Sequence, residues 1–322
     1  MVAHPESYDF DVLCRPAFAK LNLSLCVGPP EHAGSAKAGF HPIVSWMHAI
    51  ELADEVRLSH RERGSSVYSV QWAADAPRTT PIDWPIEKDL AVRAHRLMER
   101  TVGRPLPVDL QVFKRIPVGG GLGGGSSDAA ATLLGLVELF NLNMDDDALR
   151  TLAMTLGSDI AFFCDQGATG AAPRPAVVTG FGEVLRRVRP STRDAVLVVP
   201  SFGCETRAVY QAFDRNIVRE NQAARLRADE TAHQGVPEIL DDVARRNDLA
   251  AAACTVAPAL AQVCSAVALG VGGVGAASVA VSGSGSTVFA LASPGSGPAV
   301  ATRLRAMPQL NDCQIVATRL VG

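Results

Sequence analysis

Residues 117–128 read Pro117-Val118-Gly119-Gly120-Gly121-Leu122-Gly123-Gly124-Gly125-Ser126-Ser127-Asp128. The preceding segment 108–113 alternates apolar and polar side chains, which predicts a strand. The following segment 129–140 predicts a helix, because its leucine, valine and phenylalanine side chains recur on one helical face. The sequence therefore predicts a strand, a glycine loop and a helix in that order.

A glycine loop between a strand and a helix favours a phosphate ligand. Glycine permits positive φ and has no Cβ, so backbone N–H groups can converge on a ligand at close range. Ser126 or Ser127 can cap the helix, whose N-terminus carries partial positive charge. Three of the glycines match the dinucleotide pattern GxGxxG, which is a weak signal by itself. The P-loop pattern requires a lysine where Gly125 stands, so we predict a phosphate cradle without that lysine. A flexible hairpin tip is the alternative.

The composition argues against several classes of function. The chain has 322 residues and a formal net charge of −3, so it is long enough for about two domains and lacks the basic excess expected of a nucleic-acid partner. Its seven cysteines form no CxxC pair, which argues against thiolate metal sites and a disulfide framework and favours a reducing compartment. Residues 1–11 do not resemble a signal peptide. We expect a cytoplasmic protein that is a monomer or a weak homodimer.

One apolar region invites a membrane assignment. Residues 249–302 contain no Asp, Glu, Lys or Arg, and residues 257–281 could be scored as a membrane span. Gln262 and Ser265 interrupt that span, and the glycines from Gly270 on would break its helix. A buried helix, a glycine turn and a core strand explain the region better, so we expect no membrane contact.

In the first half, residues 20–27 alternate like a strand, with Lys20 and Asn22 on a polar face that we expect to be solvated. Residues 43–58 predict one strand, or two strands joined by a turn at Asp54 and Glu55. Asp159 follows Gly-Ser and precedes an apolar run, so it is either a helix N-cap or a functional carboxylate. We also predict an irregular surface segment over 64–85, an amphipathic helix over 89–104 and a second helix over 145–156.

The second half shows shorter elements. We predict a hairpin within 167–182, a helix beginning at 205–206, a charged and poorly patterned segment over 215–235, strands over 195–199, 277–281, 288–291 and 314–320, and a helix over 299–307. A small-residue turn, Ser282-Gly283-Ser284-Gly285-Ser286-Thr287, separates two of these strands.

Several motifs occur together in a fixed order along most of the chain. They are Ala19-Lys20-Leu21-Asn22-Leu23, Gly39-Phe40-His41, the run from Pro117 to Ala130, Gly157-Ser158-Asp159, and the run from Ser282 to Phe289. In this order they resemble the GHMP kinase superfamily, and within it the family of 4-diphosphocytidyl-2-C-methyl-D-erythritol kinases. The glycine run from Gly119 to Ala130 is the most specific of them.

The resemblance implies an α+β protein with the GHMP kinase fold. It implies an N-terminal domain like ribosomal-protein S5 domain 2 over 1–170, a ferredoxin-like C-terminal domain over 171–322, and an active site between them. It also implies transfer of the γ-phosphoryl group of ATP to the 2-hydroxyl of a cytidine diphosphate sugar-alcohol, in the non-mevalonate route to isoprenoid precursors. The expected partner is therefore a small molecule, with ATP as co-substrate.

Two residues match the reacting pair of the family. Asp159 corresponds to the catalytic aspartate and Lys20 to its lysine partner. Phosphoryl transfer has a loose transition state, so the hydroxyl proton can leave late while the oxygen attacks. Asp159 would orient the hydroxyl and accept that proton, and Lys20 would stabilise the negative charge.

The resemblance also assigns the ATP site. The residues expected around the phosphates are Pro117, Val118, Gly119, Gly120, Gly121, Leu122, Gly123, Gly124, Gly125, Ser126 and Ser127. Lys114 is either an added positive charge beside them or an exposed lysine at the strand end. Mg²⁺ is expected to accompany ATP, with Ser127 as the candidate protein ligand.

The resemblance assigns a set of mostly aromatic residues to the cytidine end of the substrate. Phe40 and His41 correspond to the Tyr-His pair of the family, and Phe40 keeps a stacking face without the hydroxyl. Tyr210 stands where an aromatic stacks on cytosine, and Thr206 lies one helical turn before it. Asn22 could hydrogen-bond the erythritol part.

The sequence departs from the family pattern at several places. Asp89 stands where the family often has Asn beside the adenosine, Phe18 and Ala161 replace prolines, and the 28–39 loop is long. Three other functions stay open: a GHMP-type kinase of another small alcohol such as homoserine or mevalonate, a nucleotide-binding protein without turnover, and a Rossmann oxidoreductase. The retained lysine and aspartate argue against the second, and the late position of the glycine loop argues against the third.

Overall fold

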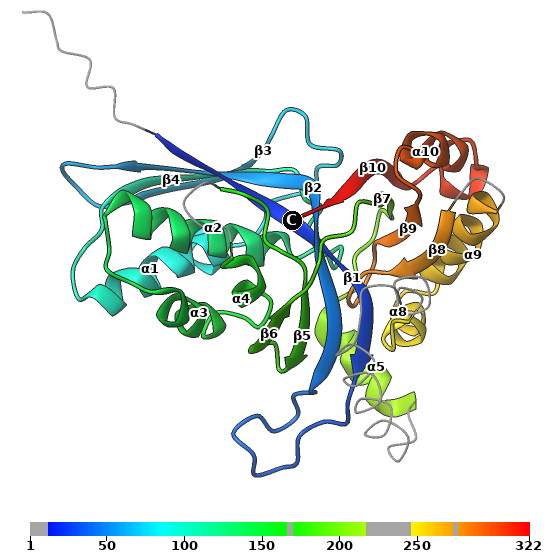
Figure 1. Cartoon of the computed structure of the whole chain (residues 1–322), viewed down its shortest axis with the longest axis horizontal. Coiled ribbons are helices and arrows are strands. Elements are labelled where there is room, and N and C mark those ends of the chain that lie inside the picture. The colour runs from blue at the N-terminus through cyan, green and yellow to red at the C-terminus, as the bar shows by residue number, and fades with distance from the viewer. Residues whose placement is uncertain (1–11, 166–169, 217–245, 273–275) are drawn as a thin grey trace, which may run out of the picture.

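The computed structural model describes residues 12–165, 170–216, 246–272 and 276–322 (Figure 1). Within these ranges, no helix combines the length and the apolar character needed to cross a bilayer. The segment 257–281, which could be scored as a span, contains the helix Ala259–Val271 and the strand Ala276–Val281, as predicted, and residues 273–275 between them lie outside the described ranges.

The described strands join into one ten-stranded sheet, ordered β3-β4-β2-β10-β7-β9-β8, with β1 and β5 also paired to β2 and β6 paired to β5. The strands are β1 (Leu13–Val27), β2 (Ile43–His60), β3 (Val67–Trp72), β4 (Val108–Lys114), β5 (Ala176–Gly180), β6 (Val184–Arg187), β7 (Asp194–Val199), β8 (Ala276–Val281), β9 (Val288–Ala292) and β10 (Gln314–Val321). The last strand joins the two parts of the sheet, because Leu320 and Val321 pair with Ile50 and Ala49 of β2 while the rest of β10 pairs with β7.

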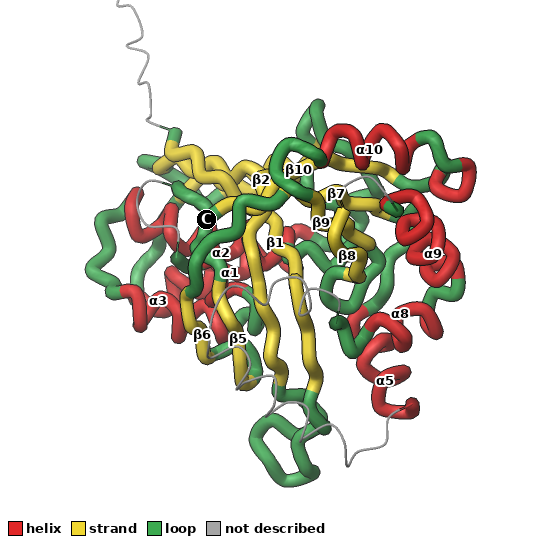
Figure 2. Tube along the Cα trace, turned by 45° about the vertical axis from the view of Figure 1, so that its right-hand side comes forward, coloured by secondary structure: helices red, strands yellow, loops and turns green. Residues whose placement is uncertain are grey.

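Helices pack against both parts of this sheet. On one side lie η1 (Ile86–Lys88), α1 (Leu90–Val102), α2 (Gly124–Leu139), α3 (Asp146–Met154) and α4 (Ile160–Phe163); on the other lie α5 (Thr206–Asn216), α8 (Ala250–Val256), α9 (Ala259–Val271), α10 (Gly297–Arg305) and η3 (Pro308–Leu310). Each set has its own buried core. The long β1–β2 pair runs between the two sets (Figures 1 and 2).

A third core cluster joins the two parts. Leu21 and Leu23 of β1 pack there with Leu197 of β7 and Phe289 of β9. This cluster holds β1, which carries Lys20, against the second part of the chain. The predicted boundary at residue 170 stays a prediction, although two separate outer cores are what a two-domain chain would contain.

Local signals explain several helix ends. The carboxylate of Asp89 accepts the backbone N–H of Ala91 at 2.9 Å and caps α1, and Asp145 caps α3 through the N–H of Ala148 at 2.8 Å. Gly103 ends α1 in the left-handed conformation, at φ 70°. The predicted helices over 89–104 and 145–156 are therefore confirmed to within two residues at each end.

Other local predictions are wrong. Residues 43–60 form one strand, which was one of the two alternatives, but the predicted turn at Asp54 and Glu55 is wrong, because Asp54 lies inside the strand with 1% exposure. Residues 67–72, predicted to be irregular, form β3, which pairs in parallel with β4. The face of Lys20 and Asn22 is buried, not solvated. Side-chain alternation misjudged it because the second part of the chain covers this face of β1.

The start of the glycine-loop helix also differs from expectation. Helix α2 begins at Gly124, within the glycine run, and Gly123 is its N-cap without a side-chain hydrogen bond. Ser126 and Ser127 therefore lie in the first turn and do not cap it. Of the charged segment predicted over 215–235, residues 217–235 lie outside the described ranges.

Candidate active site

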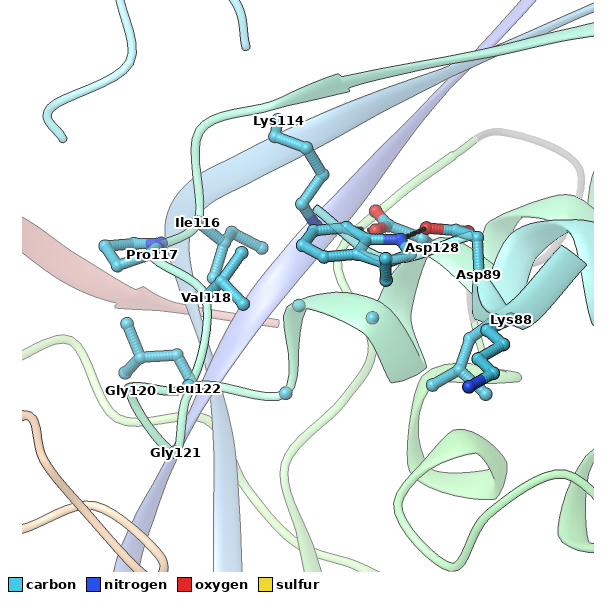
Figure 3. Close-up of a pocket in the computed structure, with 16 residues that line it drawn as sticks. Lys88, Asp89, Lys114, Ile116, Pro117, Val118, Gly120, Gly121, Leu122 and Asp128 are labelled. Carbon is cyan, nitrogen blue, oxygen red and sulfur yellow. Dashed lines mark hydrogen bonds and ion pairs between the residues drawn. The ribbon is translucent and has the colours of Figure 1, made fainter. Parts of the chain in front are cut away.

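The glycine loop leaves β4 at Lys114 and turns back into α2 (Figure 3). Gly119, Gly121 and Gly123 have φ of 73°, 75° and 74°, a backbone region that residues other than glycine rarely adopt. The alternation of these three left-handed glycines curls the loop tightly. The sequence thus needs glycine here for backbone conformation, as the phosphate-cradle prediction supposed.

The loop tip is fastened to distant parts of the chain. The carbonyl oxygen of Gly121 accepts hydrogen bonds from Lys20 Nζ at 3.1 Å and Ser282 Oγ at 3.0 Å. The backbone N–H of Lys20 donates to the Leu122 carbonyl at 2.9 Å, and Thr287 N–H donates to the Gly120 carbonyl at 3.2 Å. A Cβ on Gly121 would lie 2.2 Å from the carbonyl oxygen of Ser282. The glycine loop therefore packs directly against the small-residue turn 282–287.

A cavity of about 250 Å³ lies beside the loop. Its lining comes from the loop itself and from Trp84, Lys88, Asp89, Leu90, Lys114, Ile116 and Asp128. Figure 3 shows the loop from Pro117 to Leu122 on one side of the cavity and Lys88 and Asp89 on the other. Asp89 also accepts a hydrogen bond from the indole N–H of Trp84 at 3.0 Å. A nucleotide with its phosphates on the loop would place its base toward this Trp84–Asp89 side.

The predicted reacting pair is brought together. Lys20 Nζ lies 3.5 Å from Asp159 Oδ2, with Lys20 buried and Asp159 30% exposed. Lys20 comes from β1 and Asp159 from the residue before α4, so residues far apart in sequence meet at the loop tip. The side chain of Asp159 makes no capping hydrogen bond, which removes the simple N-cap interpretation. Its carboxylate stays available on the side that faces solvent.

Asn22 orients the lysine. Its side-chain oxygen accepts a hydrogen bond from Lys20 Nζ, and its amide donates to Ser45 Oγ at 2.8 Å. The Ser45 hydroxyl in turn donates to the Ser24 carbonyl at 2.7 Å. Asn22 is 3% exposed, so the structure places it beneath Lys20 and tied to β2.

The residues predicted for the cytidine end are partly brought together. The rings of His41 and Tyr210 have centroids 5.1 Å apart at 42°. Burial first, and then the negative charge of Asp159, raise the pKa of the Tyr210 hydroxyl above its ordinary value. Thr206 Oγ1 lies 3.0 Å from Ser284 Oγ, which connects α5 to the small-residue turn. Phe40 stands apart, with 65% of its side chain exposed.

His41 is held firmly. Its Nδ1 lies 2.8 Å from the Gly28 carbonyl, and its Nε2 lies 3.4 Å from Asp214 Oδ1 on α5. His41 is therefore not an ordinary surface histidine, since it links the end of the 28–39 loop to the helix that carries Tyr210.

Lys114 is 3% exposed, so it is not an exposed strand-end lysine. Its ammonium group binds the carboxylates of Asp54 and Asp128, the latter at 2.6 Å. Burial lowers the pKa of Lys114, but the two carboxylates raise it by more, and burial raises that of Asp128 well above its usual range. Sequence reasoning assigned no role to Asp54 or Asp128. The available signal for Asp54 was its position two residues before Val56, on the inward-facing side of β2.

Ser127, the candidate protein ligand for a metal bound with ATP, is not among the residues that line the cavity. Its hydroxyl is fully buried in the first turn of α2 and has no hydrogen-bond partner, an arrangement that costs free energy unless a ligand satisfies it. Within the described ranges, no group of three or more His, Cys, Asp or Glu side chains could hold an ion by itself. A Mg²⁺ ion here would have to take most of its oxygen ligands from phosphates and water.

Comparisons with known proteins agree with this geometry. Residues 89–167 match the family described as GHMP kinases N terminal domain, and residues 236–309 match the one described as GHMP kinases C terminal. The 4-diphosphocytidyl-2-C-methyl-D-erythritol kinase of Burkholderia mallei (strain SAVP1) is 32% identical over 231 residues, which cover 72% of this chain and 71% of that one.

Solved structures agree with the sequence comparisons. The crystal structure of a 4-(cytidine 5'-diphospho)-2C-methyl-D-erythritol kinase superposes with a TM-score of 0.67 and 31% identity, over 96% of this chain and all of that one. A homoserine kinase from Cytophaga hutchinsonii superposes with a TM-score of 0.69 over 99% and 98% of the two chains, but at 17% identity this likeness concerns the fold alone. The predicted GHMP kinase fold is confirmed.

Proposed function

Because this chain belongs to the 4-diphosphocytidyl-2-C-methyl-D-erythritol kinase family, we propose that it transfers the γ-phosphoryl group of ATP to the 2-hydroxyl of 4-diphosphocytidyl-2-C-methyl-D-erythritol. This reaction belongs to the non-mevalonate route to isoprenoid precursors. One observation carries the proposal: Lys20 Nζ lies 3.5 Å from Asp159 and 3.1 Å from the tip of the glycine loop. The acceptor hydroxyl and the transferred phosphoryl group can therefore meet beside one amine and one carboxylate.

In the proposed reaction, the substrate hydroxyl donates a hydrogen bond to the partly exposed carboxylate of Asp159. The hydroxyl oxygen forms a bond to the γ-phosphorus, the bond from that phosphorus to the bridging oxygen of ADP breaks, and the hydroxyl proton passes to the Asp159 carboxylate. Lys20 stays beside both groups and offsets the negative charge that moves between them. Asn22 keeps the ammonium group in place, so its proposed role changes from a contact with the erythritol part to support of Lys20.

The remaining site residues take proposed roles by position. The loop from Pro117 to Ser127 would surround the phosphates, and a bound Mg²⁺ would offset charge on their oxygens, with Ser127 as its protein ligand. Tyr210, His41 and Thr206 would hold the cytidine end, since the rings of His41 and Tyr210 lie together and Thr206, on the same helix as Tyr210, contacts the turn 282–287. The free state of the described cysteines is consistent with the cytoplasmic location that we expect.

The test is an ADP-release assay that compares three alcohols: the cytidyl substrate, homoserine and mevalonate. We expect kcat/KM for the cytidyl substrate to exceed the others by at least about a hundredfold, since a site built for a polar ligand rejects analogues that leave its groups unpaired. Equal or faster turnover of homoserine or mevalonate would make the enzyme a GHMP-type kinase of another alcohol. ATP binding without turnover of any of the three would favour a binding protein.

A further inference from the structure

A buried carboxylate of the neighbouring strand β2, that of Asp54, holds the start of the glycine loop by hydrogen bonds. Backbone pairing between β2 and β4 ends at Glu55 and Phe113. Just beyond this point, Asp54 Oδ1 accepts the backbone N–H groups of both Arg115 and Ile116, the latter at 2.7 Å. A side chain thus replaces the backbone ladder and turns the chain out of the sheet toward Pro117.

The exit of the loop is tied to the same point. Lys114 Nζ donates to Asp54 Oδ2 and, at 2.6 Å, to Asp128 Oδ2 of α2, the residue just after the first turn of that helix. We call Asp54, Lys114 and Asp128 the clasp. All three side chains are at most 4% exposed, so water does not screen these contacts. The clasp therefore holds both ends of the glycine loop and joins them to β2.

The charges of the clasp are unsuited to neutralising a phosphate. The clasp carries a formal charge of −1 with both carboxylates ionised and zero with a proton on Asp128, so in neither state does it offer net positive charge to a cavity that would receive a polyanion. If Lys114 moved its ammonium group to a phosphate, it would leave the buried carboxylate of Asp54 without its cation, which is strongly unfavourable. The ammonium group of Lys114 is therefore more stable in contact with its carboxylate partners than in contact with a phosphate.

We propose that Asp54 and Lys114 are positioning residues that set the shape of the phosphate loop, and that Lys114 does not bind phosphate. This inference rests on the proposed function only in that the loop binds ATP. The tip of the loop is held by Lys20 and Ser282, and its two ends are held by the clasp. Loss of the clasp should therefore weaken nucleotide binding without disturbing the Lys20–Asp159 pair.

The first test separates the accepting oxygen of Asp54 from its charge. Asp54→Asn keeps an oxygen for the two backbone N–H groups, and Asp54→Leu keeps only the volume. We expect Asp54→Leu to weaken binding of the non-hydrolysable ATP analogue AMP-PNP by at least about tenfold, and Asp54→Asn by less than about threefold. Asp75→Asn is the matched control, because Asp75 forms an exposed ion pair with Arg115 at 2.8 Å and should leave affinity unchanged.

The second test decides what the ammonium group of Lys114 does. Lys114→Met leaves two bare carboxylates, whereas Lys114→Met combined with Asp128→Asn leaves only Asp54, which still accepts two backbone N–H groups. We expect the double variant to bind AMP-PNP at least about fivefold more tightly than Lys114→Met does. If Lys114 bound phosphate directly, the double variant would bind no better than Lys114→Met.

Equal effects of Asp54→Leu and Asp54→Asn, or no recovery in the double variant, would overturn the proposal. Should Asp54→Leu fail to fold, the Lys114 and Asp128 variants still decide it. A further expected result is that kcat at saturating ATP stays within about threefold of wild type in Asp54→Leu, because positioning of the loop alters ATP binding more than the chemical step. AMP-PNP binding needs no acceptor alcohol, so failure of the substrate assignment would appear separately, as absent turnover in the wild-type enzyme.

Discussion

Substitution of Gly121 by alanine tests whether the loop tip must press against the turn 282–287. The new Cβ would lie 2.2 Å from the Ser282 carbonyl oxygen and 3.1 Å from that of Gly285, both in backbone. Neither oxygen can swing away as a flexible side chain could. The residue also has φ of 75°, which a side chain makes unfavourable by about 1–2 kcal/mol. Two separate penalties therefore fall on one small substitution.

The magnitude follows from these two penalties. Overpacking in a close-packed region costs about 1–3 kcal/mol, so strain and clash together give about 2–5 kcal/mol. The loop can relieve the clash by moving away from the turn, which loses the contacts of the Gly121 carbonyl with Lys20 and Ser282. We therefore expect the free energy of ATP binding to weaken by the lower end of this range. That loss is about 2 kcal/mol, which corresponds to a thirtyfold larger dissociation constant.

Gly119→Ala is the matched control, because Gly119 has nearly the same φ of 73° while its Cβ would meet nothing closer than 3.9 Å. Strain alone, about 1 kcal/mol, predicts only about a fivefold loss. The assay is titration of each variant with AMP-PNP, together with its thermal unfolding midpoint. Equal losses in the two variants would refute the argument, since the clash with Ser282 would then have no consequence.

Three further outcomes are expected. Asp159→Asn should bind AMP-PNP normally and lose about 10²–10⁴-fold in kcat, the usual contribution of a general base; wild-type-like turnover would exclude this role. Tyr210→Leu should raise KM for the cytidyl substrate by about tenfold and leave KM for ATP unchanged, measured by ADP release; a change confined to ATP would place Tyr210 elsewhere. His48 accepts the Ser191 N–H at Nε2, and burial lowers its pKa from 6.5 to about 4. The unfolded chain therefore binds more protons between these pH values, so the free energy of unfolding should fall by about 3 kcal/mol as pH drops from 6.5 to 4. Urea unfolding should show that His48→Gln lacks this part of the slope; an unchanged slope would contradict the argument.

The sequence by itself determined the order strand, glycine loop and helix, because left-handed glycines and amphipathic periodicity are local properties. It also supplied Lys20 and Asp159 through motifs, and the 3.5 Å contact between them, with Lys20 also bonded to the Gly121 carbonyl, agrees with that prediction. The helix start was misplaced because serine is usually an N-cap, whereas here the last left-handed glycine opens the helix.

Only the tertiary structure decided the partners of buried charges. Alternation predicted a solvated face for Lys20 and Asn22, but β1 is covered on this side by the turn 282–287, more than 250 residues later in the chain. Asp54 looked like a turn residue because nothing local shows that its carboxylate replaces backbone partners for residues of another strand. Hydrogen bonds between distant segments depend on how the strands are ordered in the sheet, and that order is set by the packing of the whole chain.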